Sequence, residues 1–148
     1  MWKIPASGGA AIQVTFGGGC EGYESPDGQT LYYIQDRDRA GLWAIPTSGG
    51  PERQVLPNIW QGSWSVTDEA IYYLALPAKQ LFRYDLATAR VTHSGHLGDG
   101  RAIQPFLSVT HDGESIVWVQ VGSDQCDLMS LRFPRAGKAA QWFSSFTF

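Results

Sequence analysis

Cysteine is scarce in this chain, and positive charge is not in excess. The two cysteines, Cys20 and Cys126, are too few for a disulfide scaffold and lack the Cys-x-x-Cys spacing of a zinc site. The formal net charge is −3, so no basic field is available to hold a phosphate backbone. We therefore expect no nucleic-acid binding by this segment.

Long apolar runs are also missing. No segment reaches the roughly 18 consecutive apolar residues that span a bilayer, so we expect no membrane insertion. The residues after Met1 lack the apolar core of a signal peptide. A repeat segment begins at once after Met1, as expected for a chain that starts inside a longer parent protein, and the sequence leaves localisation undetermined.

The sequence lacks the spacings that support catalysis or metal binding. His93, His96 and His111 are the only histidines, and none has the His-x-His or His-x-x-x-His spacing that directs two ligands to one metal. No Gly-x-Ser-x-Gly elbow exposes a nucleophilic serine. Residues 17–19, Gly-Gly-Gly, lack the Lys-Ser/Thr of a phosphate-binding loop and fit a connection between strands better. We expect no catalytic residue, no metal and no cofactor.

An internal repeat is present. Residues 2–15 align without gaps to residues 43–56, an offset of 43 − 2 = 41, and eight of the fourteen positions are identical. A turn followed by an apolar strand recurs three times, as 25–34, 66–74 and 109–119. In this turn Asp27, Asp68 and Asp112 are expected to accept hydrogen bonds from their own backbone two residues on.

This period predicts the fold. Aromatic and β-branched runs separated by Asp-Gly and Gly-Gly turns at about 40 residues are typical of four-stranded propeller blades. We predict an all-β β-propeller whose strands include 31–34, 42–45, 71–74, 81–84, 116–119 and 128–131. In one complete unit the strands are 22–25, 30–35, 41–46 and 52–56, with a loop over 36–40.

The chain is too short for a closed ring. Its 148 residues divided by the 41-residue period give about 3.6 blades, fewer than the roughly four to eight of a closed propeller. The predicted organisation is a single propeller segment, residues 1–148: the last two strands of a blade (1–15), two blades (16–56 and 57–97), and a blade plus tail (98–148). Exposed blade faces and edges would then pair with another copy, so we expect a homo-oligomer, most simply a two-fold dimer that closes a ring of about six or seven blades. A natural parent protein could instead supply the missing blades within one chain. The aromatic tail, 141–148, is expected to add a strand or to cover an exposed face.

Two motifs carry a family resemblance. Ser25-Pro26-Asp27-Gly28, followed by Leu31-Tyr32-Tyr33, resembles the core of TolB-like propeller repeats, also described as WD-like. More narrowly, the order of Gly41-Leu42-Trp43, Ile71-Tyr72-Tyr73 and Phe82-Arg83-Tyr84-Asp85 resembles the propeller segment of bacterial CadC-like winged-helix regulators. The resemblance covers nearly the whole chain. Two turns depart from the pattern: Thr67-Asp68-Glu69 replaces Pro-Asp-Gly, and Thr110-His111 replaces Ser-Pro.

Candidate binding residues lie in the expected connections between strands. These are Asp36, Arg37, Asp38 and Arg39, together with Trp60, because propellers present variable loops at these positions. By contrast, the tryptophans at strand positions are expected to pack between blades, and replacing Trp43 by alanine is then expected to cost about 3–5 kcal/mol. They are Trp2, Trp43, Trp64 and Trp118.

Two functions remain for such a segment. The first is a non-enzymatic binding or scaffolding module for a protein or a small ligand. The resemblance suggests either the sensory or interaction half of a bacterial regulator or a TolB-like periplasmic interaction platform, and likeness of fold does not choose between them. The alternative is a gating propeller of a prolyl-oligopeptidase-like hydrolase whose catalytic domain lies elsewhere. Repeats without catalytic chemistry favour the first.

Overall fold

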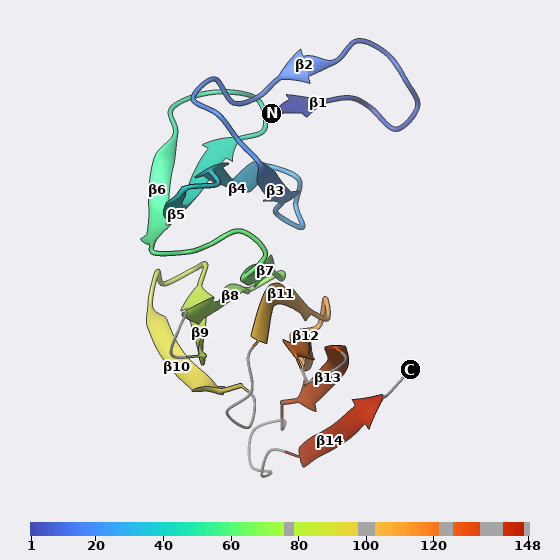
Figure 1. Cartoon of the computed structure of the whole chain (residues 1–148). Coiled ribbons are helices and arrows are strands. Elements are labelled where there is room, and N and C mark those ends of the chain that lie inside the picture. The colour runs from blue at the N-terminus through green and yellow to red at the C-terminus, as the bar shows by residue number, and fades with distance from the viewer. Residues whose placement is uncertain (76–78, 98–102, 122–125, 134–140, 147–148) are drawn as a thin grey trace. The chain divides into compact units, whose positions relative to one another are not determined.

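The chain folds into short antiparallel sheets. The computed structural model describes residues 1–75, 79–97, 103–121, 126–133 and 141–146, and over these ranges it contains β-strands and turns without a helix. Three sheets have four strands and one has two, and within each four-stranded sheet neighbours in space are neighbours in sequence (Figure 1). The all-β blade prediction is confirmed. No helix able to cross a membrane occurs among these residues.

Backbone contacts divide the chain into two compact units, residues 1–61 and 62–148. The first unit contains a two-stranded half-blade and one complete blade. The half-blade is β1 (Trp2–Lys3) and β2 (Ile12–Gln13). The complete blade is β3 (Glu21–Glu24), β4 (Thr30–Asp36), β5 (Arg39–Pro46) and β6 (Arg53–Pro57).

The half-blade packs on one face of the β3–β6 blade. Met1 and Val14 contact a cluster formed by Leu31, Tyr33 and Ile45, of which Tyr33 is fully buried. These three side chains lie on one side of the sheet because side chains alternate along a strand, and Leu31 faces Ile45 directly in the β4–β5 register. This packing of one strand pair on the next sheet gives the first unit its core.

The second unit contains two complete blades (Figure 1). Their facing sides form one apolar cluster in which Leu74 and Leu81 pack with Ile116 and Trp118. The first blade is β7 (Trp64–Val66), β8 (Ala70–Ala75), β9 (Gln80–Asp85) and β10 (Val91–His96). The second is β11 (Ile103–Val109), β12 (Ser115–Val121), β13 (Cys126–Arg132) and β14 (Gln141–Phe146).

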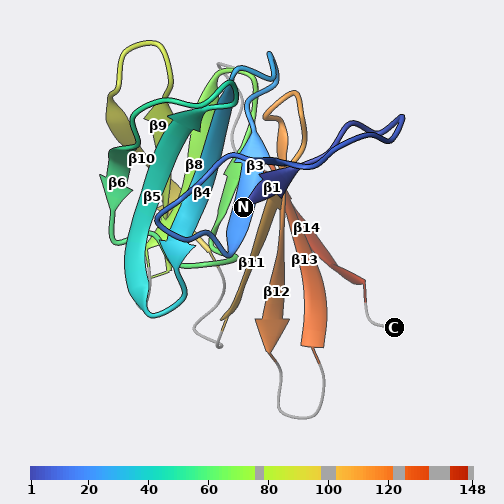
Figure 2. The ribbon, with the colours of Figure 1, turned by 90° about the horizontal axis from the view of Figure 1, so that it is seen from above.

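Strand β12 shows how the sequence produces this core. Its even-numbered residues Ile116, Trp118 and Gln120 are buried, whereas the intervening positions are half-buried. A strand presents alternate side chains to opposite faces, so one face packs on the β7–β10 blade and the other points away. The tail forms the fourth strand of this sheet, because β14 pairs with β13, and residues 147–148 lie outside the described residues (Figure 2).

The tryptophans do not share one environment. Trp64 and Trp118 are each 1% exposed, which confirms the packing expected of them. Trp43 is only partly buried, and Trp2 is 68% exposed. The prediction that Trp2 packs in a core is wrong within this chain, because β1 has a sheet on one side only.

The expected effect of replacing Trp43 changes accordingly. Because its ring keeps part of its surface in water, Trp43→Ala should lower the free energy of unfolding by roughly 1–3 kcal/mol rather than the amount for a fully buried ring. Urea unfolding followed by far-ultraviolet circular dichroism measures this difference. A loss above about 4 kcal/mol would show that the ring is buried in solution.

Candidate functional site

The predicted loop over 36–40 is a tight hairpin instead. Strand β4 extends to Asp36 and β5 starts at Arg39, and these two residues pair across the strands, so only Arg37 and Asp38 form the turn. The backbone N–H of Asp38 donates to the Asp36 carboxylate at 3.0 Å, which closes the turn. All four side chains are exposed. The hairpin presents alternating charges to solvent.

Trp60 lies in the connection between β6 and β7 and is 42% exposed. The preceding residue, Ile59, accepts a backbone hydrogen bond of 2.8 Å from Gly41 at the start of β5. This bond ties the Trp60 segment to the strand that follows the charged hairpin. A binding role for these five residues stays a prediction.

The turn between the first two strands of a blade uses its aspartate internally. In the β3–β4 turn the Asp27 carboxylate accepts from the Ser25 hydroxyl at 2.5 Å and from the backbone N–H of Gln29 at 3.0 Å. The hydrogen bond from Ser25, followed by that from Gln29, lowers the pKa of Asp27. The β11–β12 turn repeats this network, with Asp112 accepting from the Thr110 hydroxyl at 2.6 Å. Turn chemistry therefore accounts for Asp27, as expected.

The β7–β8 turn departs from this arrangement. The backbone N–H of Thr67 donates to the carbonyl of Ala70, three positions on, whereas the backbone N–H of Ser25 donates to the carbonyl of Thr30, five positions on. The β7–β8 turn is therefore two residues shorter than the β3–β4 turn. The buried Thr67 hydroxyl accepts from the backbone N–H of Ala70 at 3.2 Å, as the Ser25 hydroxyl accepts from Thr30 in the regular turn. Asp68 projects from this shorter turn toward a different blade.

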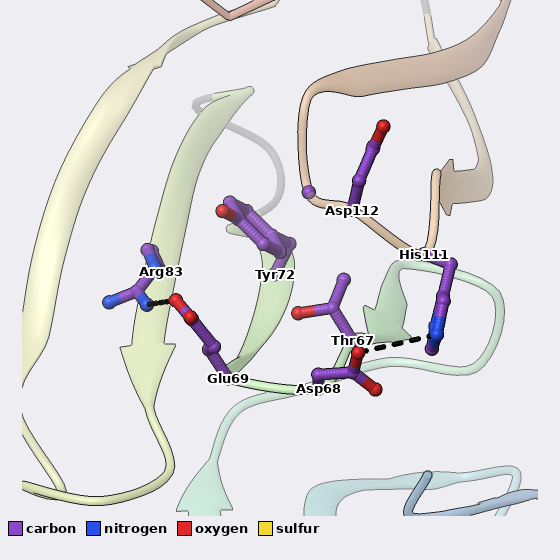
Figure 3. Close-up of a pocket in the computed structure, with 8 residues that line it drawn as sticks. Thr67, Asp68, Glu69, Tyr72, Arg83, His111 and Asp112 are labelled. Atoms are coloured by element: carbon purple, nitrogen blue, oxygen red, sulfur yellow. Dashed lines mark ion pairs between the residues drawn. The ribbon is translucent and has the colours of Figure 1, made fainter. Parts of the chain in front are cut away.

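Asp68 meets His111, which belongs to the β11–β12 turn. The Nε2 atom of His111 lies 3.2 Å from the Asp68 carboxylate, and both side chains are largely exposed (Figure 3). The expectation that Asp68 caps its own turn, in the manner of Asp27, is therefore replaced by a contact between two blades of the second unit. Exposed pairs of this kind contribute little stability, about 0–1 kcal/mol.

A pocket of about 190 Å³ lies beside this contact. The side chains around it come from both turns and from β8 and β9 of the same unit (Figure 3). Gly113 closes one side, since a Cβ added there would lie 3.4 Å from the Tyr72 hydroxyl. The lining residues are Thr67, Asp68, Glu69, Tyr72, Arg83, His111, Asp112 and Gly113.

Arg83 is the strongest base in the pocket and already has acidic partners. Its guanidinium lies 2.8 Å from the Asp85 carboxylate and 3.6 Å from that of Glu69. Burial alone would lower the pKa of Arg83, but hydrogen bonds to Asp85 and Tyr72 outweigh it and raise the pKa. The hydroxyl of Thr88, together with Arg83, lowers the pKa of Asp85 to about 2.

The pocket therefore has an acidic lining with its one arginine partly neutralised. Asp68, Glu69 and Asp112 contribute three carboxylates, against the guanidinium of Arg83. Among the described residues no three His, Cys, Asp or Glu side chains gather closely enough to hold a metal ion. Such a surface can hold a cationic group by charge and by hydrogen bonds to carboxylate oxygens.

Sequence reasoning missed this pocket, although the signal was present. The two turns that depart from the repeat pattern, Thr67-Asp68-Glu69 and Thr110-His111, are the turns that meet at the pocket. Each departure by itself is an ordinary turn variant. Only the packing of the two blades brings them together.

The blades and their order define a TolB-like β-propeller fold. No protein-family model matches the sequence, and no curated protein matches it. Among solved structures, TolB from Acinetobacter baumannii superposes with a TM-score of 0.69 at 13% identity, over 95% of this chain and 36% of that one. A putative TolB from Agrobacterium tumefaciens gives a TM-score of 0.65 at 15% identity, over 97% of this chain and 54% of that one.

An enzyme shares the same fold. An oligogalacturonate lyase solved in complex with manganese gives a TM-score of 0.65 at 17% identity, over 99% of this chain and 46% of that one. The chain thus spans about a third to a half of the length of these neighbours. At such identities the likeness shows the fold alone, a partial propeller.

Proposed function

We propose that this chain is a non-enzymatic propeller module that binds a small cationic ligand in the pocket between the β7–β8 and β11–β12 turns. The observation that carries the proposal is the meeting, at one site, of the shortened β7–β8 turn with the β11–β12 turn of the next blade. Asp27, in the regular turn, bonds its own backbone, whereas Asp68 points into the pocket. A departure from the repeat that frees a carboxylate from turn capping supplies a group for recognition.

The charge and size of the pocket define the ligand class. Its carboxylates outnumber its arginine, so an ammonium or guanidinium group gains a favourable interaction that an anion would not. A volume of about 190 Å³ is well above the roughly 10–15 Å³ that holds one water molecule. A short diamine or an alkylguanidinium fits this volume.

The position of such a module in a larger protein has two alternatives. In a CadC-like regulator the pocket would receive the signal, and an upstream winged helix in the parent reading frame would support this role. A downstream Gly-x-Ser-x-Gly domain would instead support a gating propeller of a hydrolase. No observation in the described residues favours the gating role.

Binding is tested by titrating the chain with putrescine and methylguanidinium, followed by NMR chemical shifts of the pocket residues, with citrate as the anionic probe. We expect saturable binding of the cations, weakened by salt because the site is near the surface. Asp68→Asn should raise the dissociation constant about tenfold, equivalent to about 1.4 kcal/mol. Arg83→Gln should lower the dissociation constant, since it removes the opposing charge.

Asp38→Asn is the matched control, because it removes a carboxylate from the charged hairpin outside the pocket. It should leave the dissociation constant unchanged. Loss of binding in Asp38→Asn but not in Asp68→Asn would move the site to the hairpin. Tighter binding of citrate than of either cation would contradict the proposal.

A further inference from the structure

Two sheet faces in this chain leave apolar side chains more exposed than the residues at the equivalent positions of the repeat. We name the first the half-blade face, formed by Trp2 and Ile4, which are 68% and 59% exposed. We name the second the β11–β14 face, formed by Phe106, Val117, Val119 and Leu128. Phe106 is 63% exposed and Leu128 is 42% exposed.

The half-blade face has a covered counterpart inside the first unit. Trp2 and Ile4 repeat Trp43 and Ile45 in the sequence. Ile45 is 2% exposed because Met1 and Val14 of the preceding strand pair pack over the same side of the sheet. The half-blade face is therefore the side of the sheet that, in a complete blade of this chain, packs on the blade that precedes it in the sequence.

The β11–β14 face has a covered counterpart inside the second unit. Leu128 repeats Leu81, and Val119 repeats Leu74. Leu74 and Leu81 are 1% and 0% exposed, because the β11–β14 blade packs on them. Strand alternation directs Val119 to the side opposite Trp118, so this face is the side of a blade that packs on the blade after it.

We propose that these two faces bind each other between two copies of the chain. Each face is one half of an interface that the chain already forms internally, so a second copy presents the complementary half. The contact is head-to-tail, because each face is complementary to the other face and not to itself. The side chains involved lie outside the pocket, so this inference is independent of the ligand.

Sedimentation velocity of the chain between about 1 and 100 µM tests the association, a range that detects micromolar dissociation constants. We expect concentration-dependent self-association. Trp2→Ser with Ile4→Ser, and separately Phe106→Ser with Leu128→Ser, should each raise the dissociation constant at least about tenfold. Trp60→Ser removes an exposed tryptophan outside both faces and should leave association unchanged.

Mixing the two double variants distinguishes the head-to-tail contact from other pairings. Each variant keeps the face that the other has lost, so the mixture should form a one-to-one complex although each variant alone stays monomeric. Circular dichroism of each variant should match that of the unchanged chain, which shows that the substitutions leave the fold intact. A monomeric unchanged chain, dimers that persist in either double variant, or a mixture without a complex would overturn the proposal.

Discussion

Replacing Trp118 by alanine is expected to lower the free energy of unfolding by about 3–5 kcal/mol, the range for a large buried aromatic ring. Trp118 is 1% exposed and belongs to the cluster that joins the two blades of the second unit. Removal of the indole ring would leave a cavity between two sheets, and this cavity cannot collapse unless the strands move. Urea unfolding at constant protein concentration measures the loss.

Trp118→Phe is the matched variant. The indole Nε1 of Trp118 has no hydrogen-bond partner among the described residues, so phenylalanine removes a buried polar group together with part of the ring. We expect the free energy of unfolding to fall by only about 1–2 kcal/mol. Phenylalanine leaves a smaller cavity than alanine does, and the cost of that cavity is partly offset because no unbonded N–H group is buried any longer. Equal losses in the two variants would show that the indole N–H is bonded in solution.

Replacing Gly18 by alanine should destabilise the first unit by roughly 2–5 kcal/mol. Gly18 lies in the connection between β2 and β3 with φ at +117°, where side chains are strained. A Cβ at this position would also lie 2.7 Å from the backbone oxygen of Gln35. That oxygen belongs to strand β4, so the contact is relieved only by moving the connection or the strand.

Gly8→Ala separates the two contributions. Gly8 also has a positive φ, +88°, but a Cβ there would meet no atom within 4 Å. Its replacement should cost only about 1–2 kcal/mol, the conformational part alone. A Gly18→Ala variant no less stable than Gly8→Ala in thermal unfolding would show that the close approach to Gln35 is absent.

Local patterns in the sequence predict the strands well. Each of the six predicted strands lies within an observed one, as 116–119 lies within β12, because alternation and turn residues act over a few neighbouring positions. The burial of Trp64 and Trp118 follows from the same repeat. The hairpin between β4 and β5 was predicted too long because the polar run Asp36–Arg39 resembles a loop, although strand pairing extends through it.

The pocket depends on contacts between distant parts of the sequence. Asp68 and His111 are 111 − 68 = 43 positions apart and meet at 3.2 Å only because two sheets of the second unit pack face to face. The length of the β7–β8 turn likewise depends on which backbone groups bond, Thr67 with Ala70.

The sequence by itself determined the repeat, the strands and the blade order, since each follows from periodicity, turn chemistry and the alternation of side chains. Only the tertiary structure decided which equivalent positions are covered. Trp2 and Trp43 occupy the same place in the repeat, yet Trp2 is 68% exposed and Trp43 is partly buried. Burial depends on the neighbouring sheet that supplies the opposing surface, and a residue's own strand carries no information about that neighbour.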